Sequence, residues 1–313
     1  MINLNESAFK RVKEMIDRSD EVGVSAFKAG CGATIVDAGI NSKGSYEAGR
    51  LFAEACLGGL GSVSFAVDLE LSVPSVVVKV ANPSVACLAS QYAGWALKGE
   101  GFYALGSGPA RSLYGNEPLY ATLGYRETSS VAVLAIESSK FPPDSLLETV
   151  AASCKVDISN LYVLIASTNS LAGSIQIVSR VVETALHKLF ELGYDVSKVL
   201  HGFGTCPIPP LPEDFMTAMG WTNDAVLYGG KVWITLHDEG LSIDPLTEKL
   251  PSSSSGDYGL PFLDLFKRYN YDFYQVDPML FSPAVVTINN LATGHLSSVG
   301  RENAELLRRE WFR

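Results

Sequence analysis

The chain has few of the residues that bind transition metals, and those it has are widely spaced. Four histidines and five cysteines occur among 313 residues, without an H-x-H, H-x-x-x-H or C-x-x-C pair. The ligand spacing typical of a transition-metal site is therefore missing. The odd, dispersed set of cysteines also argues against a disulfide framework and is typical of a reducing compartment. We expect neither a catalytic metal nor structural disulfides.

Positive charge and long apolar runs are also scarce. Lys and Arg number 24 against 34 Asp and Glu, so the formal net charge is −10 (24 − 34). Without a Lys/Arg-rich run, we expect no binding to nucleic acid or to an anionic membrane surface. The apolar runs are too short to span a membrane, and the first 20 residues alternate charged and apolar residues at helical spacing, unlike a signal peptide. The composition predicts a soluble, cytoplasmic protein.

Strand-like and helix-like segments are mixed along the chain without a regular βαβ alternation. The strand-like segments 62–71 and 75–80 are close enough to form a hairpin, which a purely parallel sheet does not allow. The pattern predicts an α+β fold with two lobes, although no linker marks their boundary. We assign 1–125 to lobe one, which can also include 270–313, and 126–269 to lobe two. Further strands are expected at 33–40, 101–108, 129–138, 161–168 and 230–236, and helices at 5–18, 45–59, 82–97, 143–154, 172–192 and 211–220.

A glycine-containing turn, GSGPAR (106–111), follows an apolar strand-like segment. The glycines that flank Ser107, at 106 and 108, would let the backbone approach a ligand, and amides at the start of the next helix favour an anion. Arg111 adds a guanidinium suited to a phosphate or carboxylate. A plain turn is the alternative, because one Gly-x-Gly is a weak signal and the stretch does not match G-x-G-x-x-G. The candidate ligand contacts are Gly106, Ser107, Gly108 and Arg111.

A second candidate is the loop STNSLAGS (167–174), between a predicted strand and the next helix. Ser167, Thr168 and Ser170 carry small hydroxyl groups at this junction. Such side chains commonly line ligand sites at the ends of strands. They are equally common as helix caps, and the sequence leaves both interpretations open.

The helix predicted at 172–192 has two distinct faces. Gln176, Arg180, Glu183 and His187 share the stripe opposite a broad apolar face. Arg180 and Glu183 are neighbours at i and i+3 on that stripe. Periodicity alone favours a solvated face with a surface ion pair. The alternative is a stripe that lines a wet cleft between two lobes, and the spacing does not separate the two.

Seven segments, in order across nearly the whole chain, resemble one known family. They are NSKGSYEAGRLFAEACLGGLG (41–61), CLASQYAGW (87–95), GSGPAR (106–111), IQIVSRVVETA (175–185), CPIPP (206–210), AMGWTNDAVLYGG (218–230) and RYNYDFYQVDPMLFSPA (268–284). Together they look like methenyltetrahydromethanopterin cyclohydrolase. The order of seven segments is far more specific than any single motif among them. Ser179 departs from the pattern, since glycine is expected before the arginine.

The resemblance implies an enzyme of one-carbon metabolism in methanogenesis or a related pathway. It implies reversible addition of water to the methenyl bridge of 5,10-methenyltetrahydromethanopterin, giving the 5-formyl form, with no metal or prosthetic group. It also implies two α+β lobes that face each other across a ligand pocket, in a homotrimer or another homo-oligomer. By resemblance, Arg180 and Glu183 are the catalytic pair. Tyr46, Trp95 and Tyr274 are candidates for packing the pterin ring.

Two other functions remain open from the sequence. The first is a non-catalytic relative that binds tetrahydropterins. The intact Arg-x-x-Glu sequence argues against this alternative, because a protein that had lost its catalytic activity would have no reason to keep both residues. The second is a nucleotide-binding α/β protein that uses GSGPAR for phosphate. No Walker lysine follows those glycines and no acidic ribose partner is evident, so this alternative has little support.

Overall fold

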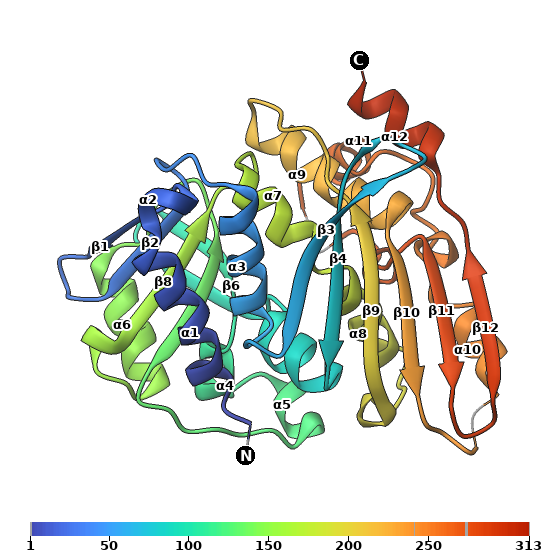
Figure 1. Cartoon of the computed structure of the whole chain (residues 1–313), viewed down its shortest axis with the longest axis horizontal. Coiled ribbons are helices and arrows are strands. Elements are labelled where there is room, and N and C mark those ends of the chain that lie inside the picture. Colours follow the sequence, from blue (N-terminus) through green and yellow to red (C-terminus); the bar gives the residue numbers. More distant parts are fainter. Residues whose placement is uncertain (1, 241, 273–274, 313) are drawn as a thin grey trace. The chain divides into compact units, whose positions relative to one another are not determined.

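The computed structural model describes residues 2–240, 242–272 and 275–312. Helices and strands alternate along these segments and build two six-stranded sheets (Figure 1). Each sheet mixes parallel and antiparallel strand pairs. The α+β fold with two lobes, predicted from the sequence, is therefore confirmed, and each lobe contains one sheet.

The chain divides into two compact units, each assembled from two separate segments. The first unit comprises Met1–Ser62 and Val85–Gln176, and the second comprises Val63–Ser84 and Ile177–Arg313. The lobes predicted from the sequence differ from these units, because they place 126–176 in the second lobe and 63–84 in the first. Strand pairing is the physical reason for the different assignment. Of the two strands within 126–176, the one at 161–166 pairs with the strand at 34–39 and the one at 132–137 pairs with the strand at 161–166. The strand at 73–81 pairs with the one at 199–207.

The first unit is built on a sheet with the strand order β1-β2-β8-β7-β6-β5. Its central strands β2, β8 and β7 run parallel, and the outer pairs are antiparallel. The strands are β1 Ser25–Lys28, β2 Thr34–Gly39, β5 Trp95–Gly99, β6 Phe102–Ser107, β7 Ala132–Glu137 and β8 Leu161–Ala166. The helices are α1 Leu4–Asp17, α2 Ser19–Val22, α3 Tyr46–Cys56, α4 Ala110–Tyr114, α5 Pro118–Leu123, α6 Asp144–Cys154 and α7 Leu171–Val178, which crosses into the second unit, with a π-helix at Ser84–Gln91.

Alternating residues of the central strands pack on opposite faces of the first sheet. On β8, Leu164 joins a core with α1 and α3, whereas its neighbours Val163 and Ile165 join a core with α6. All three side chains are fully buried. A parallel sheet covered on both faces explains why its strands appear in the sequence as continuous apolar runs.

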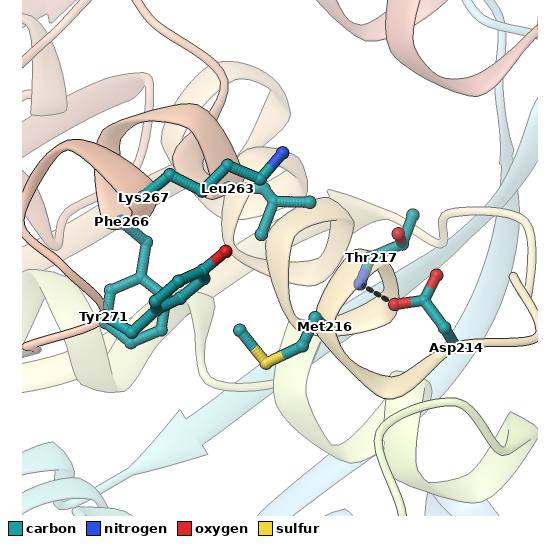
Figure 2. A pocket seen from close by; sticks show the side chains of 7 residues that line it. All are labelled: Asp214, Met216, Thr217, Leu263, Phe266, Lys267 and Tyr271. Carbon is teal, nitrogen blue, oxygen red and sulfur yellow. Dashed lines mark hydrogen bonds between the residues drawn. The ribbon is translucent and has the colours of Figure 1, made fainter.

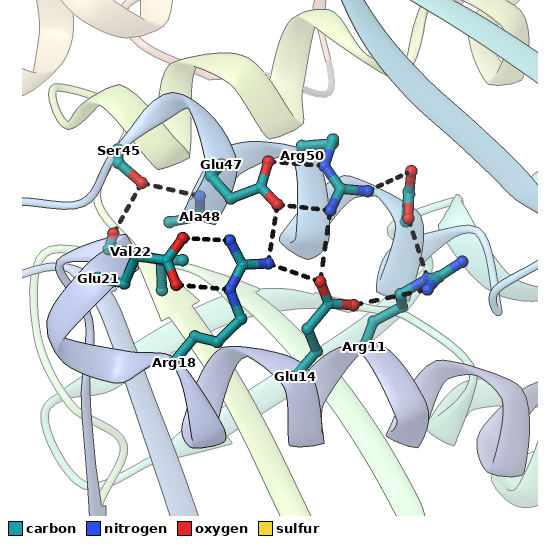
Figure 3. A network of polar contacts seen from close by, with 10 residues as sticks. Arg11, Glu14, Arg18, Glu21, Val22, Ser45, Glu47, Ala48 and Arg50 are labelled. Atoms are coloured by element: carbon teal, nitrogen blue, oxygen red, sulfur yellow. Dashed lines mark hydrogen bonds and ion pairs between the residues drawn. The ribbon is translucent and has the colours of Figure 1, made fainter.

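A network of ion pairs joins α1 to α3 on the surface of the first unit (Figure 3). Arg18 contacts Glu47 of α3 at 3.1 Å, and Arg11 contacts Glu54 of α3 at 2.9 Å. Arg50, hydrogen-bonded to Glu47, lowers the pKa of that carboxyl group. Single exposed pairs contribute little, but several charges that share partners hold two helices in one arrangement. The network fixes α1 beside α3 above the first sheet.

The second unit is built on a sheet with the order β12-β11-β10-β9-β4-β3. The β10–β11 pair is parallel, and the β4–β9, β9–β10 and β11–β12 pairs are antiparallel. The strands are β3 Gly61–Asp68, β4 Val73–Ala81, β9 Val199–Pro207, β10 Lys231–Leu236, β11 Val285–Asn290 and β12 His295–Gly300. The helices are α8 Val181–Glu191, α9 Phe215–Asp224, α10 Ile243–Thr247, α11 Phe262–Arg268 and α12 Ala304–Trp311, with a π-helix at Ala225–Gly229.

Helix α8 packs closely on β9 because that strand carries glycines beneath it. A Cβ atom on Gly204 would lie 2.7 Å from Cγ1 of Val181 and 3.0 Å from Cγ2 of Val182. Both valines are fully buried. Because a side chain on Gly204 would push the helix away, glycine here sets the height of α8 above the sheet.

The single helix predicted at 82–97 is wrong. The structure has a π-helix at Ser84–Gln91 and then strand β5 at Trp95–Gly99, which pairs antiparallel with β6. The apolar pattern of 95–99 fits either element, and the pairing decides between them. Trp95 stacks on Tyr114 with ring centroids 4.4 Å apart, which fixes the strand in the core. Tertiary packing thus overrides the local helical pattern.

Candidate active site

Three parallel strands of the first unit end in one row. Gly39 of β2 pairs with Ala166 of β8, and Ala166 pairs with Glu137 of β7. The carboxyl ends of these strands therefore meet at the same edge of the sheet. Ligands of α/β sheets bind preferentially at such an edge. We refer to it below as the carboxyl edge.

The first four residues of the predicted loop 167–174 lie on the carboxyl edge, and their hydroxyl groups are engaged there, whereas the rest of that segment belongs to α7. Ser167 Oγ donates to Asn169 Oδ1 at 2.6 Å, and Thr168 Oγ1 donates to Glu137 Oε1. Ser170 Oγ donates to the Ser167 carbonyl at 2.6 Å and accepts from the Gly173 amide at 3.1 Å, so it helps to start α7. The structure thus brings Ser167, Thr168 and Ser170 together, and Ser170 acts as a cap.

Asp37 organises the neighbouring loop, and the sequence analysis missed it. The side chain is 1% exposed, and its carboxylate accepts four backbone amides at 2.7–3.1 Å. These amides belong to the last residue of β2 and the three residues after it, 39–42. An acidic residue in a mostly apolar strand-like segment, with glycine two positions later, was the available signal. Asp37 therefore holds the second loop of the carboxyl edge in place.

The glycine turn at 106–108 is packed against protein on its inner side. Gly108 has φ +87°, a conformation that favours glycine, and its amide donates to the Ser90 carbonyl at 2.9 Å. A Cβ atom there would lie 3.2 Å from the Val133 carbonyl oxygen and the Ala135 amide nitrogen. Ser107 Oγ donates to the Gln91 carbonyl at 2.7 Å. Close backbone packing accounts for Gly108.

Arg111, predicted as an anion contact, is fully buried in the first unit. Its guanidinium binds both oxygens of the Glu117 carboxylate at 2.9 and 2.5 Å. It also donates to the carbonyls of Leu88 and Ser90 at 3.1 and 3.2 Å and lies over the rings of Tyr92 and Tyr120. These contacts favour a structural role for Arg111 over contact with a ligand.

The candidate aromatic residues differ in their surroundings. Tyr46 is the first residue of α3, directly after the cap Ser45, and is 40% exposed. Trp95 is 7% exposed and belongs to the core described above. Tyr274 lies outside the described residues. Tyr46 is therefore the described aromatic candidate whose ring is accessible.

The continuous helix predicted at 172–192 is wrong, because the chain turns between α7 and α8. The Arg180 amide donates to the Ile177 carbonyl at 3.0 Å, an i→i−3 bond that tightens the chain. Ser179, in this turn, is fully buried. Arg180 then serves as the N-cap residue of α8, with its carbonyl accepting from the Thr184 amide at 2.9 Å. The turn starts a new helix immediately before Glu183.

Glu183 lies in the first turn of α8 and is 5% exposed. The partial positive charge of a helix N-terminus stabilises a carboxylate at this position. The side chain is thus buried, unlike that of a member of a solvated surface pair. Arg180 and Glu183 belong to the second unit, whereas Tyr46, the 106–111 turn and the 167–170 loop belong to the first.

Lys188, five residues after Glu183 on α8, is a buried cation that the sequence analysis also missed. The side chain is 1% exposed, and Nζ donates to the Pro251 carbonyl and to Ser254 Oγ, both at 2.9 Å. Burial lowers the pKa of Lys188 to about 8, while the charge of Asp277 raises it. These bonds tie α8 to the serine-rich loop of the second unit.

We expect Lys188 to make the free energy of unfolding depend on pH in the alkaline range. The pKa is lowered from its usual 10.5 to about 8 in the folded chain, so between these values the unfolded chain binds the extra proton. The free energy of unfolding should therefore rise with pH in this window, relative to that of Lys188→Met, by at most ~1.4 kcal/mol per pH unit. Urea unfolding from pH 7 to pH 10.5 measures this difference.

The matched control for the Lys188 experiment is Lys267→Met on α11, which removes a lysine whose side chain is 51% exposed. The loss of one positive charge is common to both variants. If the two variants showed the same pH dependence relative to the wild type, burial of Lys188 would not be the cause.

A surface pocket of the second unit lies between α9 and α11 (Figure 2). Both apolar and charged side chains line it. The lining residues are Asp214, Met216, Thr217, Leu263, Phe266, Lys267 and Tyr271. None of the predicted site residues is among them, so the pocket adds nothing to the predicted active site.

Among residues 2–240, 242–272 and 275–312, no three His, Cys, Asp or Glu side chains lie close enough together to hold a metal ion. Over the same residues, no helix is long and apolar enough to cross a membrane.

Comparison with known proteins gives one consistent result. The model of the family described as Cyclohydrolase (MCH) matches residues 3–311. A methenyltetrahydromethanopterin cyclohydrolase of Methanococcus maripaludis strain S2 is 43% identical over 99% of this chain and 98% of its own length. The protein of that name from Methylobacillus flagellatus is 44% identical over 97% of this chain and 94% of its own. The protein of that name from Methanocaldococcus jannaschii is 42% identical over 99% of this chain and 98% of its own length.

Proposed function

Because the chain belongs to the methenyltetrahydromethanopterin cyclohydrolase family, we propose that it adds water reversibly to the methenyl bridge of 5,10-methenyltetrahydromethanopterin. The product is 5-formyltetrahydromethanopterin, in one-carbon metabolism. The main support for this proposal is sequence similarity to cyclohydrolases over nearly the whole length of the chain. Both methanogens and a methylotroph contain the relatives, so the likeness indicates the reaction and leaves its physiological direction open.

Glu183 is the proposed general base. The methenyl carbon belongs to an amidinium-like cation, so it is electrophilic before any catalyst acts. Water attacks this carbon and loses a proton to Glu183, giving a carbinolamine. Breaking the bond from that carbon to N10 then leaves the formyl group on N5, and the hydroxyl proton passes to N10. A carboxylate near the cation both accepts the proton and stabilises the positive charge.

Arg180 is the proposed partner of Glu183. Desolvation of a buried carboxylate disfavours its charged form, whereas a nearby guanidinium and the helix N-terminus favour it. Arg180 immediately precedes α8, so the backbone position of this residue adjoins the first turn, which contains Glu183. The guanidinium is also suited to donate a hydrogen bond to the attacking water or to the developing oxygen.

The proposed substrate contacts in the first unit are Ser167, Thr168 and Ser170 on the carboxyl edge, with Tyr46 packing the pterin ring. Gly106, Ser107 and Gly108 remain proposed contacts, through atoms other than the Gly108 amide, which donates to the Ser90 carbonyl. For Arg111, the contacts with Glu117 support a structural role. The pterin is the substrate, and no metal or prosthetic group takes part in the proposed reaction.

The subunit arrangement and the location are further parts of the proposal. We infer a cytoplasmic homotrimer or other homo-oligomer. Support for this arrangement comes from the resemblance alone. Light scattering coupled to size-exclusion chromatography measures the mass of the assembly, and a monomeric mass would contradict the inference.

The decisive test is loss of methenyl absorbance on mixing the enzyme with methenyltetrahydromethanopterin. Turnover well above the spontaneous rate supports a cyclohydrolase. Binding without turnover would indicate a non-catalytic relative. The nucleotide-binding alternative draws no support from the 106–111 turn, because the Gly108 amide and the Arg111 guanidinium both have protein partners. Equilibrium dialysis with ATP would detect such binding.

A further inference from the structure

The turn of α8 that carries Glu183 lies directly on strand β9. A Cβ atom on Gly202 would lie 2.4 Å from Cγ1 of Val182, and one on Gly204 would lie 2.7 Å from Cγ1 of Val181. Both distances are well below the contact distance of about 3.5–4.0 Å between carbon atoms. The helix therefore approaches the strand more closely than residues with side chains at these two positions would allow.

The strand beneath this contact is held in place from both sides. Gly204 pairs with Val78 of β4 on one side and with Val232 of β10 on the other. The valines above it, Val181 and Val182, are fully buried and branch at Cβ, so their side chains have few alternative rotamers. A side chain at position 204 would therefore displace the helix and leave the central strand where it is.

A displacement of this turn also displaces the proposed base. Val181 and Val182 immediately precede Glu183 in the first turn of α8. Increasing the 2.7 Å separation at Gly204 to ordinary carbon contact requires a shift of about 1 Å. Reacting atoms must come within about 3–3.5 Å of each other, and a misplacement of about 1 Å can lower a rate on the order of 10²-fold. The depth of the helix is thus a part of the proposed catalytic geometry.

We propose that Gly204 is a positioning residue for Glu183, because the bare backbone of β9 at this point sets the depth at which α8 presents the base. The inference rests on the proposed function, since it concerns the same base. It assigns part of the catalytic geometry to a strand residue that has no functional group of its own. Glu183 accepts the proton, and Gly204 determines where the carboxylate is when it does so.

The test is Gly204→Ala, assayed with methenyltetrahydromethanopterin. We expect kcat to fall roughly 10- to 100-fold, while KM changes by less than about threefold, because the proposed substrate contacts lie outside α8. In a Glu183→Gln background the same substitution should lower the residual rate by less than about threefold, since no base remains to be displaced. A merely structural role would lower the rate equally in both backgrounds.

A second variant relieves the contact from the helix side. Val181→Ala removes Cγ1, the atom nearest to the new side chain, so Gly204→Ala/Val181→Ala should recover part of the lost kcat. If Gly204→Ala does not fold, the double variant takes its place. It retains the contact with Val182, at 3.0 Å, and should show a smaller fall in kcat that again depends on Glu183.

Two other glycines of the second unit serve as controls. A Cβ atom on Gly220 of α9 would lie 2.9 Å from Cβ of Leu263, so Gly220→Ala crowds a different helix contact. It should lower the free energy of unfolding and leave the kcat of the folded enzyme unchanged. Gly256 is exposed, and a Cβ atom there would have no neighbour within 4 Å. Gly256→Ala should change neither quantity.

A crystal structure of Gly204→Ala separates this inference from the proposed function. The first turn of α8 should be displaced from β9 by about 1 Å, as the contact distances require. An undisplaced turn, an unchanged kcat or an equal loss in the Glu183→Gln background would overturn the positioning role. Absence of turnover in the wild type would contradict the cyclohydrolase, whereas a displaced turn would still show that Gly204 sets the depth of α8.

Discussion

Glu183→Gln is expected to lower the turnover number roughly 10²- to 10⁴-fold while leaving the fold intact. The change is nearly isosteric and removes the base that takes the proton of the attacking water, and positioned proton transfer is typically worth that factor. Binding of the methenyl substrate should change much less than turnover. Stopped-flow absorbance gives the rate, and fluorescence titration gives the affinity. Retention of more than about a tenth of wild-type turnover would show that Glu183 is not the base.

Two comparisons sharpen this expectation. Glu191→Gln, at the exposed end of α8, removes a carboxylate from the same helix and should leave turnover unchanged. The double variant Arg180→Met/Glu183→Gln should lose little more than the worse single variant, because residues that act as a unit are not additive. Full additivity in the logarithm of the rate would mean that the two side chains act independently.

Arg111→Met is expected to destabilise the folded chain by about 3–5 kcal/mol, the usual loss when one partner of a buried ion pair is removed. The substitution keeps most of the side-chain volume. It leaves the Glu117 carboxylate, whose side chain is 13% exposed, without its guanidinium and deprives two buried carbonyls of their donors. Urea unfolding followed by circular dichroism measures the loss.

The control for Arg111 is Arg126→Met, which removes one hydrogen bond to the Gly115 carbonyl from an exposed arginine. We expect this change to cost about 1 kcal/mol or less. Adding Glu117→Gln to Arg111→Met should recover part of the stability, since no buried charge then remains unpaired. If Arg111→Met lowered the free energy of unfolding by less than about 1 kcal/mol and also weakened substrate binding, the result would support Arg111 as a ligand contact and contradict the structural role.

The parts of the site that lie within one local motif could be predicted from the sequence. The 167–170 loop was identified because hydroxyl side chains follow an apolar strand, and the structure places them at a strand end. Asp37 and Glu137 were missed because their environment depends on which strands pair. The sequence contains each carboxylate, but the register that brings Gly39, Ala166 and Glu137 into one row is formed across more than 100 residues.

Helix ends were harder to predict than helix existence, for two different reasons. The turn at Ser179–Arg180 contains neither glycine nor proline, so nothing local marks the break between α7 and α8. At 82–97, Asn82 suits a helix cap and Pro83 the first helical position, but pairing of Trp95–Gly99 with β6 decided the second half of the segment. Local signals favour the start of an element, whereas long-range partners decide where it stops.

The interleaving of the two units also has a consequence for synthesis on the ribosome. Ala81 of β4 pairs with His201 of β9, and 120 positions separate them (201 − 81). At ~5–20 residues per second, β4 waits on the order of ten seconds for this neighbour to be made. The first unit, complete in sequence at Gln176, can form during that interval. The nascent β3–β4 segment must meanwhile stay unpaired on its β9 side without aggregating, which makes it the part of the chain where a ribosome-associated chaperone would be of most use.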